Sequence, residues 1–125
     1  YFTDFNIVRG EDSLVRAILS GNAFVWNAYI QDNKYQKVKV NALCETMEKF
    51  FESSYDYREY LQLMLAFNDI EREDLQLLST ENFKYFFNNL NIFKHTTQKM
   101  CYFVHRHCNL IEKISTFIEN FRNNQ

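Results

Sequence analysis

The end of the chain carries an apolar seam that repeats with the period of an α-helix. Its members follow one another at alternating steps of four and three positions: Met100, Val104, His107, Ile111, Ile114, Ile118 and Phe121. An average step of about 3.5 residues keeps all of them on one helical face. Phe103, Leu110 and Phe117 widen that face. We therefore expect one long helix over residues 97–120, covered by other helices or by a partner.

Glycine and proline are nearly missing from the chain. Gly10 and Gly21 are the only glycines among 125 residues, and there is no proline. Sheets joined by tight turns normally use Gly, Pro or Asn-Gly pairs, so this scarcity favours helices. It also argues against a glycine-rich phosphate loop, which needs several residues without a Cβ beside the phosphate.

The remaining pattern predicts seven helices joined by short links. Their expected ranges are 12–20, 22–30, 38–53, 57–67, 68–78, 79–88 and 97–120. Gly21 stops the first, and the range 57–67 is apolar nearly all round, which is typical of a central element. The prediction is an all-α, single-domain irregular helical bundle or short α-solenoid of about six to seven helices, with a long C-terminal helix.

We expect residues 1–125 to form one helical domain, because a chain of this length can close a core without disulfides. Residues 1–10 alternate loosely and could form a short strand, an extended arm or the stub of a preceding domain. The chain opens on Tyr1 rather than Met, which is compatible with a fragment of a longer protein.

Charge argues against a nucleic-acid surface. The formal net charge is -2, and no block of basic residues stands out. Lys99, Arg106 and Lys113 lie seven apart and would form a ridge beside the seam of one helix. Three cations neutralise about three phosphates and give weak, salt-sensitive binding, which Glu112 and Glu119 would oppose. We expect no nucleic-acid partner and no membrane span.

One stripe carries metal-competent side chains. Cys101, His105, Cys108 and Glu112 are spaced four, three and four apart, and each is a possible zinc ligand. Ligands on one straight helix are collinear, whereas a tetrahedral site needs donors that converge from two elements. We therefore expect no metal, and the sequence shows no signature of a cofactor.

No catalytic arrangement is visible either. Acidic residues such as Glu71, Glu73 and Asp74 fall on a polar stretch typical of a solvated surface, and Cys44 lies on the inward face of an expected helix. The sequence predicts no catalytic residues and a protein that is not an enzyme.

The leading functional prediction is a non-enzymatic adaptor or scaffold module that binds another protein, either a second copy or a heterologous partner. Aromatic residues make up 18% of the chain, and Trp26, Tyr29, Tyr35, Tyr55 or Tyr102 could serve as interface anchors. Tyr102 is the first choice. A homodimer through the C-terminal helix would satisfy the seam.

The composition, rich in Phe, Tyr, Asn, Ile and Lys, suggests an AT-rich genome such as that of a large DNA virus or a protozoan. Three cysteines without a disulfide framework predict an intracellular location, cytoplasmic or nuclear. The alternative function is a nucleic-acid-associated helical domain of a replication or packaging protein, which would use Lys99, Arg106 and Lys113.

Overall fold

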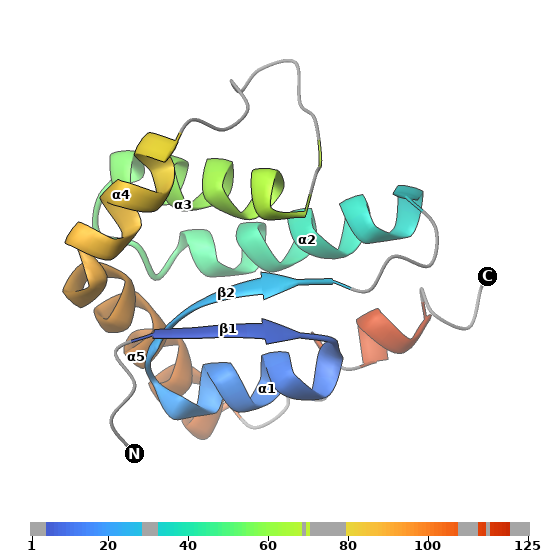
Figure 1. Cartoon of the computed structure of the whole chain (residues 1–125). Helices are drawn as coiled ribbons and strands as arrows, with labels where there is room; N and C mark the ends of the chain where they lie inside the picture. Colours follow the sequence, from blue (N-terminus) through green and yellow to red (C-terminus); the bar gives the residue numbers. More distant parts are fainter. Residues whose placement is uncertain are drawn as a thin grey trace.

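Two parallel strands lie among several helices in the computed structural model (Figure 1). The structure describes residues 5–28, 33–68, 70, 80–107, 113–114 and 116–120. The elements are β1 (Phe5–Arg9), α1 (Glu11–Ser20), β2 (Ala23–Asn27), α2 (Asn33–Glu48), α3 (Ser54–Phe67), α4 (Thr80–Asn88) and α5 (Leu90–Arg106). Residues 113–114 and 116–120 are helical as well. The mostly helical architecture is confirmed, and it agrees with a bundle.

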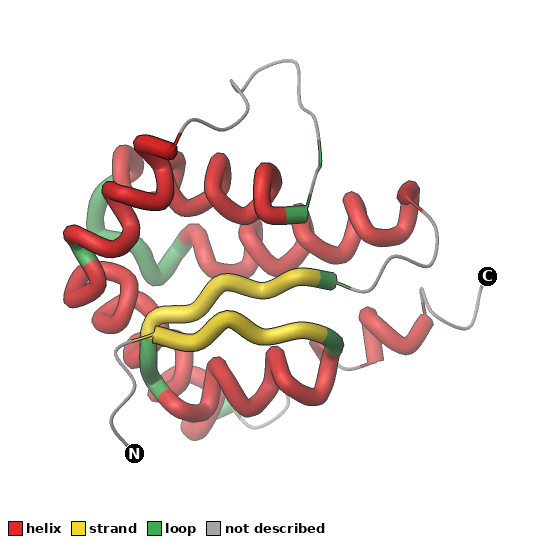
Figure 2. The backbone as a smooth tube through the Cα atoms, viewed as in Figure 1, coloured by secondary structure: helices red, strands yellow, loops and turns green. Residues whose placement is uncertain are grey.

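The first three elements form a strand–helix–strand unit. β1 and β2 pair in parallel, with Phe5 opposite Ala23 and Arg9 opposite Asn27. Parallel strands need a crossover connection, and α1 supplies it by running back along the pair (Figure 2). A short strand was one of the forms expected within residues 1–10, and β1 confirms it for Phe5–Arg9.

The predicted helix over residues 22–30 is wrong, because Ala23–Asn27 is a strand. Its first four residues are all buried, with α1, α3 and α5 in contact with the strand. A parallel strand covered on both faces becomes a continuous apolar run, and periodicity cannot distinguish such a run from a buried helix. The low glycine and proline content did not indicate this strand, because strands joined by a helical crossover need no tight hairpin turn.

The predicted single helix over residues 97–120 is also wrong. α5 begins at Leu90 and ends at Arg106, and His107 leaves the helical conformation with φ -127° and ψ 66°. Met100 and Val104 are buried on α5, and Ile118 is buried on the later helical residues. The apolar seam is therefore divided between two segments, although Val104 and Ile114 still border one small cavity against α1. Ile111 lies outside the described residues.

The other helices agree with the sequence in position and differ at their ends. α2 begins and ends a few residues earlier than the expected range 38–53, whereas α1 and α4 match their expected ranges closely. The N-cap of α3 is Ser53, whose Oγ accepts hydrogen bonds from the N–H groups of Tyr55 and Asp56 at 3.1 and 3.4 Å. The helix expected over 68–78 falls largely outside the described residues. None of the helices in the described ranges is long and apolar enough to cross a membrane.

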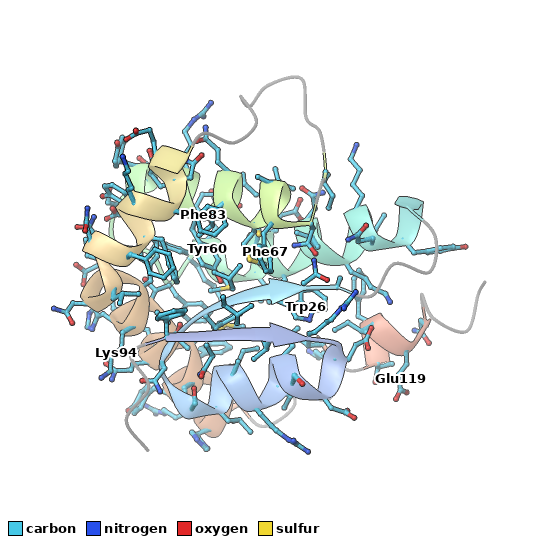
Figure 3. All side chains as sticks on the ribbon, viewed as in Figure 1. Trp26, Tyr60, Phe67, Phe83, Lys94 and Glu119 are labelled. Carbon is cyan, nitrogen blue, oxygen red and sulfur yellow. The ribbon has the colours of Figure 1, made fainter. Side chains whose placement is uncertain are left out.

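An aromatic core confirms that α3 is central. Tyr60 is buried on the side of α3 that faces β2, and its hydroxyl donates to the carbonyl of Phe24 at 2.7 Å (Figure 3). Its ring stacks on Phe93 of α5 with centroids 5.6 Å apart, and the ring of Phe86 of α4 lies 6.4 Å away. These contacts join β2 to α3, α4 and α5.

Side chains of α3 and its C-cap complete the hydrogen bonding along the second edge of β2. The N–H of Trp26 donates to the sulfur of Met64 at 3.5 Å. The buried amide of Asn68, the C-cap of α3, donates to the carbonyl of Trp26 at 2.9 Å and accepts from the N–H of Ala28 at 2.8 Å. One side chain thus satisfies two backbone groups that a further strand would otherwise have to pair.

Both glycines are needed for their backbone conformation. Gly21 ends α1 with φ 72° and ψ 10°, the left-handed cap expected for it. Gly10 joins β1 to α1 with φ 79° and ψ 170°, a region essentially restricted to glycine.

Replacing Asn68 by alanine should lower the free energy of unfolding by about 2 to 4 kcal/mol, because the buried N–H of Ala28 and carbonyl of Trp26 lose their partner. Urea unfolding of the variant measures this loss. The matched control is Asn88→Ala at the exposed end of α4, expected to change stability by less than about 0.5 kcal/mol. Equal effects of the two substitutions would contradict the role given to Asn68.

The two glycines offer a second comparison. Gly21→Ala should cost about 1 to 2 kcal/mol through the left-handed conformation alone, because a Cβ there would meet Gln98 Cγ at an acceptable 3.4 Å. Gly10→Ala should cost up to about 3 kcal/mol, since its conformation excludes other residues. Denaturant unfolding of both variants checks the order, and a neutral Gly10→Ala would refute it.

Candidate functional site

The carboxyl ends of both strands meet at one edge of the sheet. Figure 1 shows the start of α1, the start of α2 and the helical residues 113–114 and 116–120 at this same end of the molecule, at the right of the view. In open α/β arrangements, ligands bind outside the carboxyl ends of parallel strands. We name the group formed by Arg9, Gly10, Glu11 and Lys39 the carboxyl-edge site.

Gly10 is fixed on both sides of its backbone. Its N–H donates to the carbonyl of Asn27 at 3.4 Å, and its carbonyl accepts from the N–H of Leu14 at 3.2 Å. The same carbonyl accepts from Nε1 of Trp26 at 2.9 Å. Because Trp26 is completely buried, the junction between β1 and α1 is attached to the core of the molecule.

The start of α1 is suited to an anion. Gly10 has no side chain to cap the helix, so the first-turn N–H groups receive no bond from that position. These groups and the helix dipole give the N-terminus a partial positive charge. Arg9 lies directly before it on the exposed end of β1, and an arginine is a good partner for phosphate oxygens.

A buried ion pair lies beside this helix start. Nζ of Lys39 on α2 donates to Oε1 of Glu11 at 3.1 Å. The Lys39 side chain is 1% exposed and the Glu11 side chain 16%. The lysine is therefore fully enclosed by the protein, and most of the Glu11 side chain is buried with it.

The segment after β2 is held in place too. Asn27 donates from Nδ2 to the carbonyl of Phe67 at 3.2 Å. Gln36, buried on α2, lies with Nε2 3.5 Å from both the carbonyl of Ala28 and Oδ1 of Asn68. Both strand ends are thus held by hydrogen bonds to other parts of the chain.

A cavity of about 430 Å³ adjoins the carboxyl-edge site. It lies between α1, α2 and the C-terminal helical residues, and its lining includes Leu14, Lys39, Leu43, Lys113 and Phe117. The wall is mainly apolar, and Lys39 connects it to Glu11.

The structure places Tyr102 and Arg106 together on α5. Tyr102 is 63% exposed. The guanidinium of Arg106 lies 5.7 Å from the centroid of its ring, and Nη1 donates to its hydroxyl at 3.2 Å. The pair is available at the surface, and its use in binding stays a prediction.

Lys99 and Lys113 do not form the expected single ridge with Arg106. Lys99 donates to Oε1 of Glu52 at 3.0 Å, and His95 shares that oxygen at 3.2 Å. The hydrogen bond and charge of Lys99, followed by those of His95, hold the pKa of Glu52 below its usual value. Because α5 ends at Arg106, the seven-residue spacing does not carry Lys113 along the same helix, and Lys113 lies instead at the cavity.

The expected metal stripe is only partly described. Cys101 and His105 lie on α5, where the thiol of Cys101 is 3.5 Å from the carbonyl of Leu19, while Cys108 and Glu112 lie outside the described residues. Across the described ranges, no three His, Cys, Asp or Glu side chains gather as metal ligands. The expectation that the protein binds no metal remains untested.

Sequence reasoning missed the carboxyl-edge site and misplaced Trp26. Trp26 was a candidate surface anchor, yet it is buried, so that expectation is wrong. The sequence did contain a signal. Gly10 lies between a short alternating segment and two acidic residues that open a helix, and an apolar run follows Gly21. That order is typical of a strand–helix–strand unit, but the pairing of Glu11 with Lys39 carries no sequence signature.

Comparison with known proteins identifies relatives. The family model described as Elongation-Factor P (EF-P) rhamnosyltransferase EarP matches residues 1–119. Protein-arginine rhamnosyltransferases of Pseudomonas putida and Shewanella oneidensis are 49% and 46% identical over 39 residues, 31% of this chain and 10% of each relative. That of Neisseria meningitidis is 37% identical over 51 residues, 41% of the chain and 13% of the relative. The chain thus aligns with about a tenth of the length of these relatives.

These matches overturn the functional predictions. The family and its relatives are named as glycosyltransferases, so the prediction of a non-enzymatic adaptor or scaffold is wrong, and so is the alternative of a replication or packaging domain. The relatives are bacterial, which contradicts a viral protein. With residues 1–119 matched by one family model, the chain belongs to the EarP family of elongation-factor P rhamnosyltransferases.

Proposed function

We propose that this chain is part of a protein-arginine rhamnosyltransferase that acts on elongation factor P, and that its carboxyl-edge site takes part in the transfer. The family match supports the reaction class. The anchored start of α1, beside Arg9 and Glu11, supports the location. This location is the single structural observation on which the proposal depends.

The reaction requires a rhamnose donor with a good leaving group, and a phosphate ester is the chemistry that the site fits. The bond between the anomeric carbon and the phosphate oxygen breaks, and the phosphate leaves with the electron pair. A bond forms from the same carbon to a guanidinium nitrogen, which gives up one proton to a base. Negative charge grows on the leaving phosphate, where Arg9 and the first-turn N–H groups of α1 would stabilise it.

Glu11 fits the acceptor side of the reaction. A carboxylate binds an arginine guanidinium through strong charge-assisted hydrogen bonds. It also follows Gly10 directly, so a group bound to it would lie beside the start of α1. We therefore assign Glu11 to holding the acceptor arginine and Arg9 to holding the donor phosphate.

The partner in this proposal is a protein, elongation factor P, which agrees with the expectation of a protein partner. Translation factors work inside the cell, so the proposal places the enzyme there, in the cytoplasm of a bacterium rather than in a nucleus. A homodimer through the C-terminal helix has no part in it.

The proposal can be tested on the longer protein that contains this chain. Purified enzyme, a phosphate-activated rhamnose donor and elongation factor P are mixed, and the mass of the factor is followed for the addition of one rhamnosyl unit. Arg9→Met should lower kcat/KM by about 10²-fold, because the leaving phosphate loses a charged donor.

The matched control is Arg106→Met, which removes an exposed arginine at the far end of α5 and should leave transfer within about twofold of wild type. Loss of transfer in Arg106→Met with normal transfer in Arg9→Met would move the site to α5. A wild-type protein that transfers no rhamnose would refute the proposed function.

A further inference from the structure

β1 has one paired edge and one open edge. Successive residues of a strand direct their backbone N–H and carbonyl groups to opposite edges. The N–H of Gly10 donates to the carbonyl of Asn27 at the end of β2. The groups of Val8 therefore face β2 as well, and those of Ile7 face the other way. The sheet in the described part of the chain consists of β1 and β2, so no described strand pairs with Ile7.

The opposite edge of this sheet is closed. β2 lies between β1 and α3 (Figure 2), and Met64 and Asn68 bind its outward backbone groups. A further strand can therefore be added only beside β1. Strands at a natural edge are protected by lysine, proline or a bulge, whereas β1 pairs without a bulge from Phe5 to Arg9 and has an isoleucine at its centre.

An apolar surface continues from this edge onto α4. Ile7 is 58% exposed, and Phe5, two positions earlier, lies on the same face of β1. The ring of Phe5 is 5.0 Å from that of Phe87 on α4. Phe87 is 43% exposed and stacks on Phe83, with ring centroids 6.3 Å apart. We name Phe5, Ile7, Phe83 and Phe87 the β1–α4 strip.

The strip marks a face of the sheet that is only partly covered. Nδ2 of Asn6 donates to Oγ of Ser20 at 3.4 Å, so α1 covers the face of β1 that carries Asn6. Ile7 lies on the other face, where α4 reaches only as far as Phe5 among the contacts of the described rings. Parallel sheets are normally covered by helices on both faces, so this sheet lacks both a neighbouring strand and part of its cover.

We propose that the open edge of β1 and the β1–α4 strip receive a further parallel strand and its covering helix from the part of the enzyme that lies outside this chain. The length of the relatives supports this occupant. In two of them 39 residues are 10% of the protein, so they are about three times as long as this chain. The inference rests on the proposed function only in treating the chain as part of a longer enzyme.

Two other occupants fit less well. A second copy related by two-fold symmetry would place its β1 antiparallel to the first, which would interrupt a parallel sheet. Elongation factor P is released after each transfer and would leave the strip exposed between reactions, although exposed apolar patches promote aggregation. A segment of the same enzyme pairs in parallel and stays in place.

Hydrogen exchange of the unaltered full-length enzyme tests the pairing, read at single amides by NMR. The N–H of Val8 faces β2 and serves as the internal control. Both amides, of Ile7 and of Val8, should exchange at least about 10³-fold more slowly than an unstructured amide, at every protein concentration and without elongation factor P. An Ile7 amide that exchanges freely beside a protected Val8 amide would overturn the inference.

Cross-linking identifies the occupant. A photoreactive benzophenone amino acid replaces Ile7 in the full-length enzyme, and mass spectrometry locates the linked peptide. The link should form within one molecule, to a peptide outside residues 1–125. The same amino acid in place of Tyr102, 63% exposed on α5, reports random collisions and should give at most about a fifth of the yield between molecules that Ile7 gives within one.

Each contrary result has a separate meaning. Links between two copies, links to added elongation factor P, or links that stay within residues 1–125 would overturn the inference, as would an Ile7 amide protected only when one of those partners is present. Rhamnosyl transfer is measured on the same preparation. Normal transfer with an unprotected Ile7 amide refutes this inference alone, whereas a protected Ile7 amide without transfer refutes the proposed function alone.

Discussion

The hydrogen bond from the indole of Trp26 to the carbonyl of Gly10 fixes the geometry of the carboxyl edge. A buried indole N–H must find an acceptor within the protein, and this acceptor is the residue that turns β1 into α1. The same carbonyl receives the N–H of Leu14, which begins the helix. One backbone group therefore joins β1, α1 and β2, and the position of Glu11 follows from it.

The site combines charges of both signs within a short stretch. The helix start and Arg9 favour an anion, whereas Glu11 favours a cation. Such an arrangement suits a transfer in which a phosphate leaves from one side of a sugar carbon and a guanidinium approaches from the other. Lys39 is buried and balances the charge of Glu11 from inside the protein.

The predictions about function failed because they relied on patterns along the chain. Two glycines exclude a glycine-rich loop, but the start of a helix needs only one residue such as Gly10 to leave its N–H groups open to a ligand. Glu11 and Lys39 come from different elements, and neither has a spacing that marks it as functional. The apolar run at residues 23–26 resembled part of a buried helix, so the second strand was not predicted. Without that strand, the carboxyl edge of the sheet could not be located.

The sequence by itself determined the helices whose signals are local. α1 with its stop at Gly21, α3 and α4 all lie close to their expected ranges, because capping and periodicity act over a few residues. Tertiary structure alone decided that β2 is a strand, that α5 ends at Arg106 and that Lys39 meets Glu11. Each of these three features depends on contacts with elements that are distant in the sequence. The spacing of residues along the chain does not indicate such contacts.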